Sequence, residues 1–204
     1  MNKEARVFIV DDDASVRDSI SFLLDSVDIP YTAFPDALSF LDTLADTDHG
    51  CLVLDIRMPG MSGLDLQARL IELDVAIPIV FITGHGDIPM AVEAMRRGAV
   101  DFIRKPFRDQ ELLDRINEAL SKDANERAQA DSLKEMKAAI SELTPREVEI
   151  FERVCDGQAN KVMAIDLGIS ERTIEIHRGQ VMKKTGARSL AELVRLKIAL
   201  EASP

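Results

Sequence analysis

The chain has 204 residues, of which 46% are hydrophobic, and a net charge of −11. This is enough apolar material for two modest domains with proper cores. The chain shows no long apolar run and no N-terminal leader pattern, so we expect a cytoplasmic protein that does not contact a membrane. The two cysteines fall in different predicted domains and the three histidines are isolated, which excludes a disulfide framework and a His/Cys metal site.

The charge is unevenly distributed along the chain. Residues 1–121 carry 11 basic and 22 acidic residues, whereas residues 122–204 carry 14 of each. Within the second part, residues 161–197 hold eight basic residues against four acidic ones. The two halves therefore suit different partners. The basic cluster could meet a polyanion, although charge alone favours a solvated helix face.

Strand and helix patterns alternate over the first 120 residues. Apolar runs predict strands near residues 6–10, 31–34, 51–54, 79–82 and 101–104. Helical periodicity predicts helices near residues 14–27, 36–46, 63–73, 87–97 and 109–121. Five strand–helix units in succession predict a doubly wound α/β domain, in which a parallel five-stranded sheet carries helices on both faces.

Polar side chains follow four of the five predicted strands, namely Asp11, Asp12 and Asp13, then Asp55, Thr83 and Lys105. Asp55 ends the third apolar run, and a turn-rich loop with Pro59 and Gly60 follows it. In open parallel sheets, reactive groups gather outside the carboxyl ends of the strands. We therefore expect an acid cluster, a hydroxyl and an ammonium around Asp55, although a lone aspartate there would more often be a turn or cap residue.

Four segments of the first half occur in the order and at the intervals typical of one family: VDDD at 10–13, LDIRMPGMSG at 54–63, FITG at 81–84 and KPF at 105–107. On these segments, residues 5–120 resemble the receiver domain of a bacterial two-component response regulator. The resemblance implies a flavodoxin-like sheet with strand order 2-1-3-4-5. It also implies that a sensor histidine kinase phosphorylates Asp55.

The same resemblance implies a magnesium ion beside Asp55. A carboxylate can attack phosphorus if the charge on the phosphoryl oxygens is neutralised, and Mg²⁺ prefers carboxylates, water and phosphate oxygens as ligands. We expect Asp12 and Asp55 to be direct ligands and Asp11 to bind directly or through water. In the family the set is completed by a backbone carbonyl, which here is that of Arg57.

Three further residues occupy functional positions of the receiver pattern. Lys105 is expected to contact a phosphoryl oxygen, and the peptide bond before Pro106 is expected to be cis. Thr83 and Phe102 match the family's switch pair, in which the hydroxyl follows the new phosphate and the ring rotates inward. Otherwise Thr83 would be an ordinary cap and Phe102 an ordinary core residue.

The second half of the chain is predicted to be helical throughout. Residues 122–141 are rich in Ala, Glu and Lys and lack Gly and Pro, which indicates a helical linker that continues the helix at 109–121. Further helices are expected near 145–156, 160–167, 171–185 and 189–201. A short helix, a turn containing Gly168 and a longer basic helix are typical of a helix-turn-helix. The predicted domains are thus 1–121 and 142–204, with 122–141 as the linker.

Residues 143–200 resemble a LuxR-type helix-turn-helix domain through the segments LTPRE at 143–147, NK at 160–161, DLGIS at 166–170 and RTIEIHR at 172–178. The whole layout resembles the FixJ/NarL class of response regulators. The resemblance implies that helix 171–185 enters the major groove of double-stranded promoter DNA, where Glu175, Ile176 and Gly179 touch base edges. The rest of the predicted DNA-binding surface, mostly phosphate contacts, consists of Lys161, Arg172, Thr173, His177, Arg178, Lys183 and Lys184.

Two of these assignments have open alternatives. His177 could be a packing residue inside the domain. Glu175 could form an ion pair with Arg172 or Arg178 along the helix instead of meeting a base.

The two halves together predict a transcriptional regulator, not an enzyme, that is controlled by phosphorylation and works with RNA polymerase, as an activator. Phosphorylation is expected to produce a homodimer through the fourth helix and the fifth strand, with interface residues Ile88, Val92, Met95 and Arg104. Some of the apolar ones could instead pack that helix onto the sheet.

Two other functions remain open at this point. One is a constitutive DNA-binding regulator whose receiver is structural. The other is an aspartyl-phosphate phosphatase of the haloacid dehalogenase type, which would carry a second aspartate where this chain has Arg57.

Overall fold

The computed structural model describes residues 5–45, 49–84 and 88–201, with the backbone alone at residues 88 and 201. The chain divides into two compact units after Glu126, and each unit is described by itself. No helix within the described ranges combines the length and the apolar character that crossing a membrane would require.

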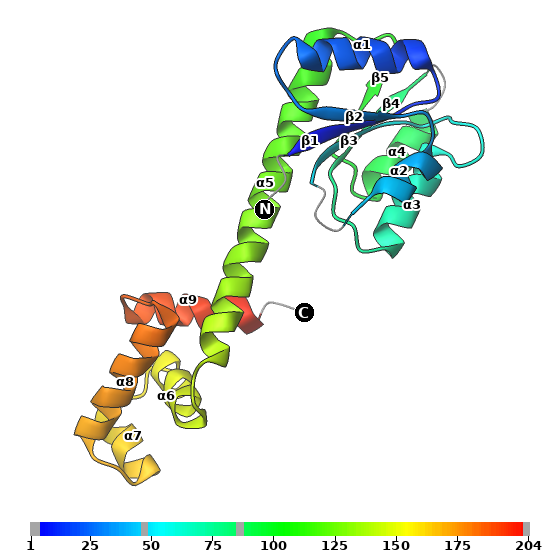
Figure 1. The fold of residues 1–204 in the computed structure, drawn as a ribbon. Helices are drawn as coiled ribbons and strands as arrows, with labels where there is room; N and C mark the ends of the chain where they lie inside the picture. Colours follow the sequence, from blue (N-terminus) through cyan, green and yellow to red (C-terminus); the bar gives the residue numbers. More distant parts are fainter. Residues whose placement is uncertain (1–4, 46–48, 85–87, 202–204) are drawn as a thin grey trace. The chain divides into compact units, whose positions relative to one another are not determined.

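The first unit is built on a parallel five-stranded sheet of order β2-β1-β3-β4-β5, which confirms the predicted fold class (Figure 1). Its strands are β1 (Arg6–Val10), β2 (Tyr31–Phe34), β3 (Gly50–Asp55), β4 (Ile79–Thr83) and β5 (Asp101–Arg104). Its helices are α1 (Ala14–Asp25), α2 (Ala37–Thr43), α3 (Gly63–Glu72), α4 (Ile88–Arg96) and the first part of α5 (Asp109–Ser141).

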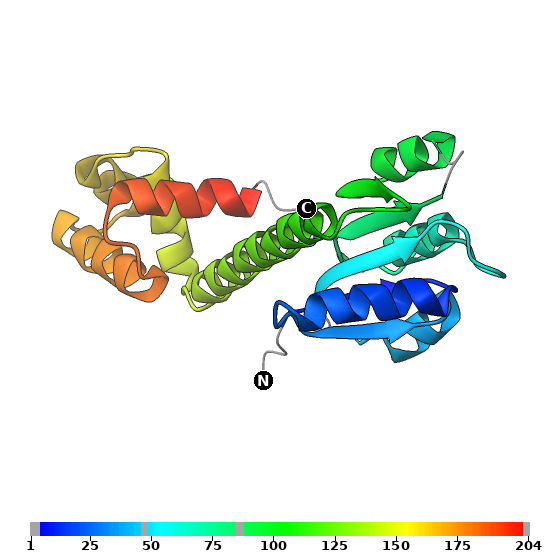
Figure 2. The ribbon, with the colours of Figure 1, turned by 90° about the horizontal axis from the view of Figure 1, so that it is seen from above.

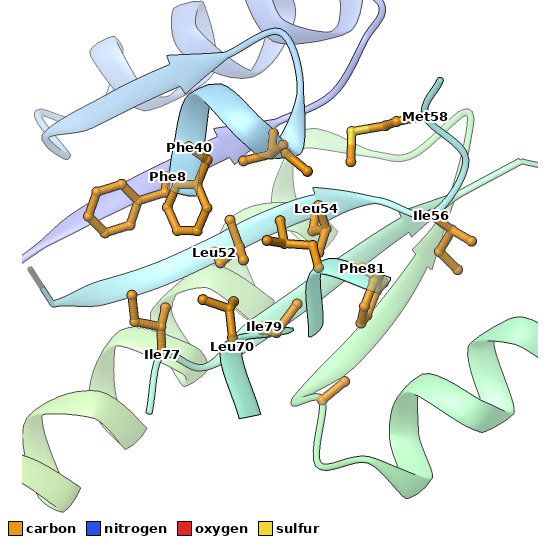
Figure 3. Packing of buried hydrophobic residues seen from close by; sticks show 14 of the residues in the cluster. Phe8, Phe40, Leu52, Leu54, Ile56, Met58, Leu70, Ile77, Ile79 and Phe81 are labelled. Atoms are coloured by element: carbon orange, nitrogen blue, oxygen red, sulfur yellow. The ribbon is translucent and has the colours of Figure 1, made fainter. Parts of the chain in front are cut away.

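The helices form one layer on each face of the sheet (Figures 1 and 2). Alternate strand residues point to opposite faces, so each strand contributes to two cores. One core joins the sheet to α1 and α5, and the other joins it to α2, α3 and α4. In the second core, the ring of Phe40 lies edge-on to those of Phe8 and Phe34, with ring centroids 5.6 and 5.4 Å apart (Figure 3).

The register brings the carboxyl ends of the strands to one edge. Asp55 is level with Ile82 of β4. Thr83 in turn is level with Arg104 of β5. β1 ends one residue before Asp11. The groups that the sequence places after the strands therefore meet at the same edge of the sheet.

A contact between α5 and the residue before β3 lies at the opposite end of the strands, where β3 begins. Asp123 of α5 is 2% exposed, and its Oδ2 lies 3.5 Å from Nδ1 of His49, which directly precedes β3. Because α5 is one continuous helix, residues 122–141 are helical, as their composition indicates. The boundary between the units lies within this segment.

The second unit contains the rest of α5 and the helices α6 (Pro145–Cys155), α7 (Asn160–Leu167), α8 (Glu171–Thr185) and α9 (Leu190–Glu201). Thr144 and Glu147 form a capping box at the start of α6. Gly168 ends α7 in the left-handed region with φ of 65°, where a side chain would be disfavoured. Buried residues of α6 to α9, including Ile174 and Val181, form one core.

An ion pair between Glu147 and Lys184 connects α6 to α8 within this unit. The carboxylate of Glu147, a residue 5% exposed, accepts a hydrogen bond from Lys184 Nζ at 2.7 Å. Hydrogen bonds from the Lys184 side chain and then from the Thr144 backbone hold the pKa of Glu147 at about 2, well below its usual 4.5. Glu147 therefore stays ionised in the folded state at neutral pH.

Glu147→Gln is expected to destabilise the second unit at neutral pH, because it leaves Lys184 without its carboxylate. Since the folded-state pKa is lowered, this contribution is present above the unfolded-state value. It is lost as the pH falls from about 5 towards about 2. Thermal unfolding of wild type and variant across this range should show their difference shrinking. The exposed Glu152→Gln is the matched control, and a difference that stays constant with pH would argue against the ion pair.

Candidate functional site

Two carboxylates and one ammonium meet at the carboxyl edge of the sheet. Asp55 is 5% exposed, and its Oδ1 accepts a hydrogen bond from Lys105 Nζ at 2.5 Å. The same Nζ donates to Asp11 Oδ2 at 2.7 Å. The backbone N–H of Arg57 donates to the other oxygen of Asp55 at 2.7 Å. The ends of β1, β3 and β5 thus converge on one point, as the strand-end pattern predicts.

The electrostatics of this group follow from two carboxylates sharing one cation. Burial raises the pKa of Asp55, and the nearby charge of Asp11 adds to this, although Lys105 and the Arg57 N–H act in the opposite direction. Burial alone would lower the pKa of Lys105, but its hydrogen bonds to both carboxylates outweigh this and raise it. Lys105 is therefore cationic at neutral pH, and the pocket carries excess negative charge.

Every polar group of Asp11 has a hydrogen-bond partner. Its N–H donates to the Phe34 carbonyl at 3.3 Å, and its own carbonyl accepts from Arg17 Nη1 at 2.7 Å. Its Oδ1 accepts from the Asp13 N–H at 2.9 Å, while Oδ2 accepts from Lys105. Such complete pairing is what a buried carboxylate requires, since Asp11 has no exposed surface.

The two acids that follow Asp11 have different surroundings. Asp13 is the N-cap of α1, and its Oδ1 accepts from the Ser15 N–H at 2.8 Å and from the Ser15 hydroxyl at 2.7 Å. These bonds to Ser15 lower the pKa of Asp13. Asp12, between the buried Asp11 and this cap, is exposed. Its carboxylate is open to solvent beside the buried pair.

The oxygen donors fit the expected magnesium ion, but they do not yet form a closed set. Within the described residues, no group of three or more His, Cys, Asp or Glu side chains is arranged to hold a metal. The ammonium of Lys105 lies between the carboxylates of Asp11 and Asp55 instead. Both carboxylates nevertheless reach one common cation position, with Asp12 next in the chain. All are hard oxygen donors, which Mg²⁺ prefers.

The predicted switch pair lies near this edge. Thr83 is 3% exposed, its hydroxyl lies 3.4 Å from the Gly84 carbonyl, and its own carbonyl accepts from the Lys105 N–H at 2.7 Å. Phe102 is half-buried against the core on the α2–α4 face. The Lys105–Pro106 peptide bond is cis, as predicted. The movement of Thr83 and Phe102 on phosphorylation stays a prediction.

The exposed face of α4 carries apolar side chains. Val92 is 46% and Met95 38% exposed, whereas Ala91 and Ala94 are buried and pack the helix onto the unit. Packing onto the sheet therefore does not account for Val92 or Met95. Arg104 on β5 is also exposed. The side chain of the fourth predicted interface residue, Ile88, lies outside the described part of the structure.

Helix α8 presents the predicted DNA-binding surface. Ile174 and Val181 face the core, while Ile176 is 53% exposed. A Cβ atom added at Gly179 would meet no atom within 4 Å. The other members of this surface that are exposed are Lys161, Arg172, Glu175 and Lys183, and Thr173 and His177 are partly buried.

Four charged residues of this surface have partners inside the unit. Arg172 Nη1 lies 3.3 Å from Glu175 Oε2, so the predicted pairing along the helix forms in part of the surface. Arg178 is half-buried and donates to Asn160 Oδ1 at 2.6 Å. Lys184 is engaged by Glu147. Arg178 and Lys184 thus have partners within the unit at positions where the sequence predicts DNA contacts, and those DNA contacts stay a prediction.

The sequence did not single out Arg17 or the steric role of Gly63. Arg17 lies in the first turn of α1, where a cation is unusual, and this position is the signal that could have drawn attention to it. Gly63 begins α3 directly under Asp55. A Cβ atom at this position would lie 2.2 Å from the Asp55 carbonyl oxygen. A glycine after a turn-rich loop is an ordinary turn signal, so the residue type alone does not indicate that Gly63 lies this close to Asp55.

Comparisons with known proteins identify both units. Residues 7–117 match the model of the response regulator receiver domain, and residues 141–197 match that of the bacterial regulatory proteins of the luxR family. The transcriptional regulatory protein FixJ of Bradyrhizobium diazoefficiens is 44% identical over 197 residues, which is 96% of each chain. The chain belongs to the FixJ/NarL class of response regulators.

Further relatives support this membership. Nodulation protein W of Bradyrhizobium diazoefficiens is 48% identical to this response regulator over 193 residues, covering 95% of this chain and 85% of the relative. The structure of response regulator StyR superposes with a TM-score of 0.87 at 45% identity, covering 96% of this chain and 99% of StyR. Full-length FixJ from B. japonicum gives a TM-score of 0.60 at 41% identity, with 99% and 100% coverage.

Proposed function

We propose that this response regulator controls transcription in response to phosphorylation of Asp55. The observation that carries the proposal is the buried Asp55 carboxylate at the end of β3, which Lys105 contacts and which shares that ammonium with Asp11. A nucleophile needs an accessible oxygen and a positive group that stabilises the charge developing on the phosphoryl oxygens. Asp55 supplies a carboxylate that keeps a small exposed surface, and Lys105 supplies the positive group.

The phosphoryl donor is a histidine of a sensor kinase. An oxygen of Asp55 forms a bond to phosphorus while the bond from phosphorus to the imidazole nitrogen breaks, and the imidazole takes up a proton. Lys105 then forms an ion pair with a phosphoryl oxygen instead of with the free carboxylate. When bound, Mg²⁺ would be held by Asp11, Asp12, Asp55 and the Arg57 carbonyl and would neutralise the phosphoryl oxygens.

The phosphorylated carboxylate acts as a switch because it adds nearly two negative charges and strong hydrogen-bond acceptors to a buried edge. Thr83 directly follows Ile82, which is level with Asp55, and its hydroxyl is expected to follow the phosphate. Phe102 is half-buried and is expected to rotate inward. The apolar face formed by Val92 and Met95, with Arg104, then joins a second copy of the chain. Ile88 belongs to the same proposed interface.

The dimer brings two copies of α8 to one promoter. A single helix-turn-helix domain buries little DNA, so that two half-sites give useful affinity. Ile176, Glu175 and Gly179 meet base edges, and Lys161, Arg172, Thr173, His177 and Lys183 contact the backbone around them. The bound dimer acts on RNA polymerase as an activator in the cytoplasm. The similarity to FixJ, a transcriptional regulatory protein, supports the transcriptional role.

Intact-protein mass after incubation with acetyl phosphate tests the proposal. Wild type with Mg²⁺ is expected to gain the mass of a single phosphoryl group, because Asp55 contacts Lys105 and, unlike the fully buried Asp11, keeps some exposed surface. Asp55→Asn is expected to gain nothing, since a carboxamide cannot form the acyl phosphate. Removing Mg²⁺ with EDTA should abolish the gain in wild type. Gel filtration of the phosphorylated sample should then show the mass of a dimer.

The outcomes separate the parts of the proposal. Equal phosphate gain by Asp55→Asn would place the phosphate elsewhere. A phosphorylated protein that stays monomeric would exclude the dimer but not the switch. If wild type gains no phosphate and binds no beryllium fluoride, the chain is a constitutive DNA-binding regulator with a structural receiver.

A further inference from the structure

The guanidinium of Arg17 lies against the turn that carries the acidic residues. Arg17 is in the first turn of α1, and its Nη1 donates to the carbonyl oxygen of Asp11 at 2.7 Å. The side chain is half-buried, so this bond is partly shielded from water. A charged donor makes a hydrogen bond shorter and stronger than a neutral one does. Arg17 therefore holds this turn more firmly than a solvent-exposed contact would.

The bond acts on the peptide group between Asp11 and Asp12. The Asp11 carbonyl and the Asp12 N–H belong to one planar unit, so a donor fixed on the carbonyl fixes the orientation of the whole plane. The other groups of Asp11 are held by Phe34, Asp13 and Lys105. With Arg17 in place, every polar group of Asp11 has a hydrogen-bond partner, which restricts the backbone that leads into Asp12.

Two electrostatic effects disfavour a cation at the position of Arg17. A cation in the first turn of a helix is disfavoured by the helix dipole. A cation near a metal site also weakens metal binding by charge repulsion. Charge alone therefore predicts that removing Arg17 strengthens the binding of Mg²⁺. A positioning role predicts the opposite, because a loosened turn no longer presents Asp12 beside Asp11 and Asp55.

We infer that Arg17 is a positioning residue of the Asp55 site, which orients the carboxylate of Asp12 towards the magnesium position by fixing the Asp11–Asp12 peptide. The inference rests on the proposed function, since it assigns a role in the Mg²⁺ site. Arg17 itself touches neither the phosphoryl group nor the metal. Its effect reaches the ion through the backbone, as a group outside the ligand set commonly does.

Calorimetric titration of the full chain with MgCl₂ tests this role. Arg17→Met, which keeps an apolar stem but no donor, is expected to bind Mg²⁺ roughly tenfold more weakly than wild type. Arg17→Lys, which keeps one donor, should recover part of the loss. Arg69→Met is the matched control, because Arg69 lies on α3 and pairs with Glu72 at the surface. Its Mg²⁺ affinity should equal that of wild type.

The melting temperature in EDTA separates positioning from folding. It should stay close to that of wild type for both Arg17 variants. Unchanged or tighter Mg²⁺ binding by Arg17→Met would overturn the inference and leave the proposed function intact. A wild type that binds no Mg²⁺ would overturn both. If Arg17→Met does not fold, Arg17→Lys carries the test, and its affinity must then fall below that of wild type.

Discussion

Gly63→Ala is expected to destabilise the receiver unit by about 2 to 3 kcal/mol and to prevent normal phosphorylation of Asp55. The added Cβ would lie 2.2 Å from the Asp55 carbonyl oxygen and 3.1 Å from Ile56 Cα. Both neighbours are backbone atoms in a buried strand end, which cannot move aside as the end of a side chain does. The Gly63 N–H also donates to the Ile56 carbonyl at 2.9 Å. The clash therefore acts directly on the residue that carries the nucleophile.

Urea unfolding followed by NMR measures this effect, with the amide signals of Val53 and Ile174 reporting the first and second units. Only the Val53 transition should move to lower urea. Gly179→Ala is the matched control, because its Cβ meets no atom within 4 Å and alanine favours the interior of a helix. It should stabilise the second unit by up to about 1 kcal/mol. A Gly63→Ala protein with wild-type stability would show that α3 can shift away from the strand.

Ile176→Ala is expected to lose most sequence-specific DNA affinity while leaving the fold and the nonspecific affinity unchanged. Ile176 is 53% exposed, so truncation costs little packing. An apolar contact to a thymine methyl, or another base contact, contributes about 1–3 kcal/mol to discrimination. In a dimer the loss occurs in both half-sites, so the total reaches about 2–6 kcal/mol. The loss removes a large part of the roughly 4–10 kcal/mol that separates specific from nonspecific binding.

Binding isotherms with a selected promoter fragment and with random DNA, at the same series of salt concentrations, measure the ratio of specific to nonspecific affinity. Lys183→Met is expected to weaken both affinities alike and to reduce the salt dependence by about one ion per half-site. Ile165→Ala on α7, a residue 72% exposed, should change neither affinity. A uniform loss for Ile176→Ala on both DNAs would assign Ile176 to the backbone or to the fold, and not to base readout.

Local sequence patterns predicted the elements of both units closely because periodicity and turn residues act over a few positions. Asp55 could be placed at the carboxyl end of a strand from the sequence alone. An apolar run predicts a buried strand, and the acid that follows it marks where that strand ends. The order of the strands depends on pairings between distant residues, and it came from the resemblance to receivers. The same applies to the cis bond before Pro106.

Side-chain direction limited what could be predicted at the sites. Lys184 and Arg178 belong to a basic helix, and composition does not tell a phosphate contact from an internal partner. The partner of Lys184 is Glu147, 37 residues earlier in the chain. The contact of Arg17 runs to a backbone carbonyl, which has no signature in the residue types. Such contacts depend on the packing of whole helices and need the folded structure.

The buried contact of Asp123 with His49 sets where the receiver can be cut from the rest of the chain. A fragment that ends at residue 121, where the α/β pattern stops, loses the acid that anchors the last turn of α5 within the unit. The end of α5 then frays beside the start of β3, since a helix end without partners is weakly held. An isolated receiver that extends at least to Glu126 retains the contact between Asp123 and His49.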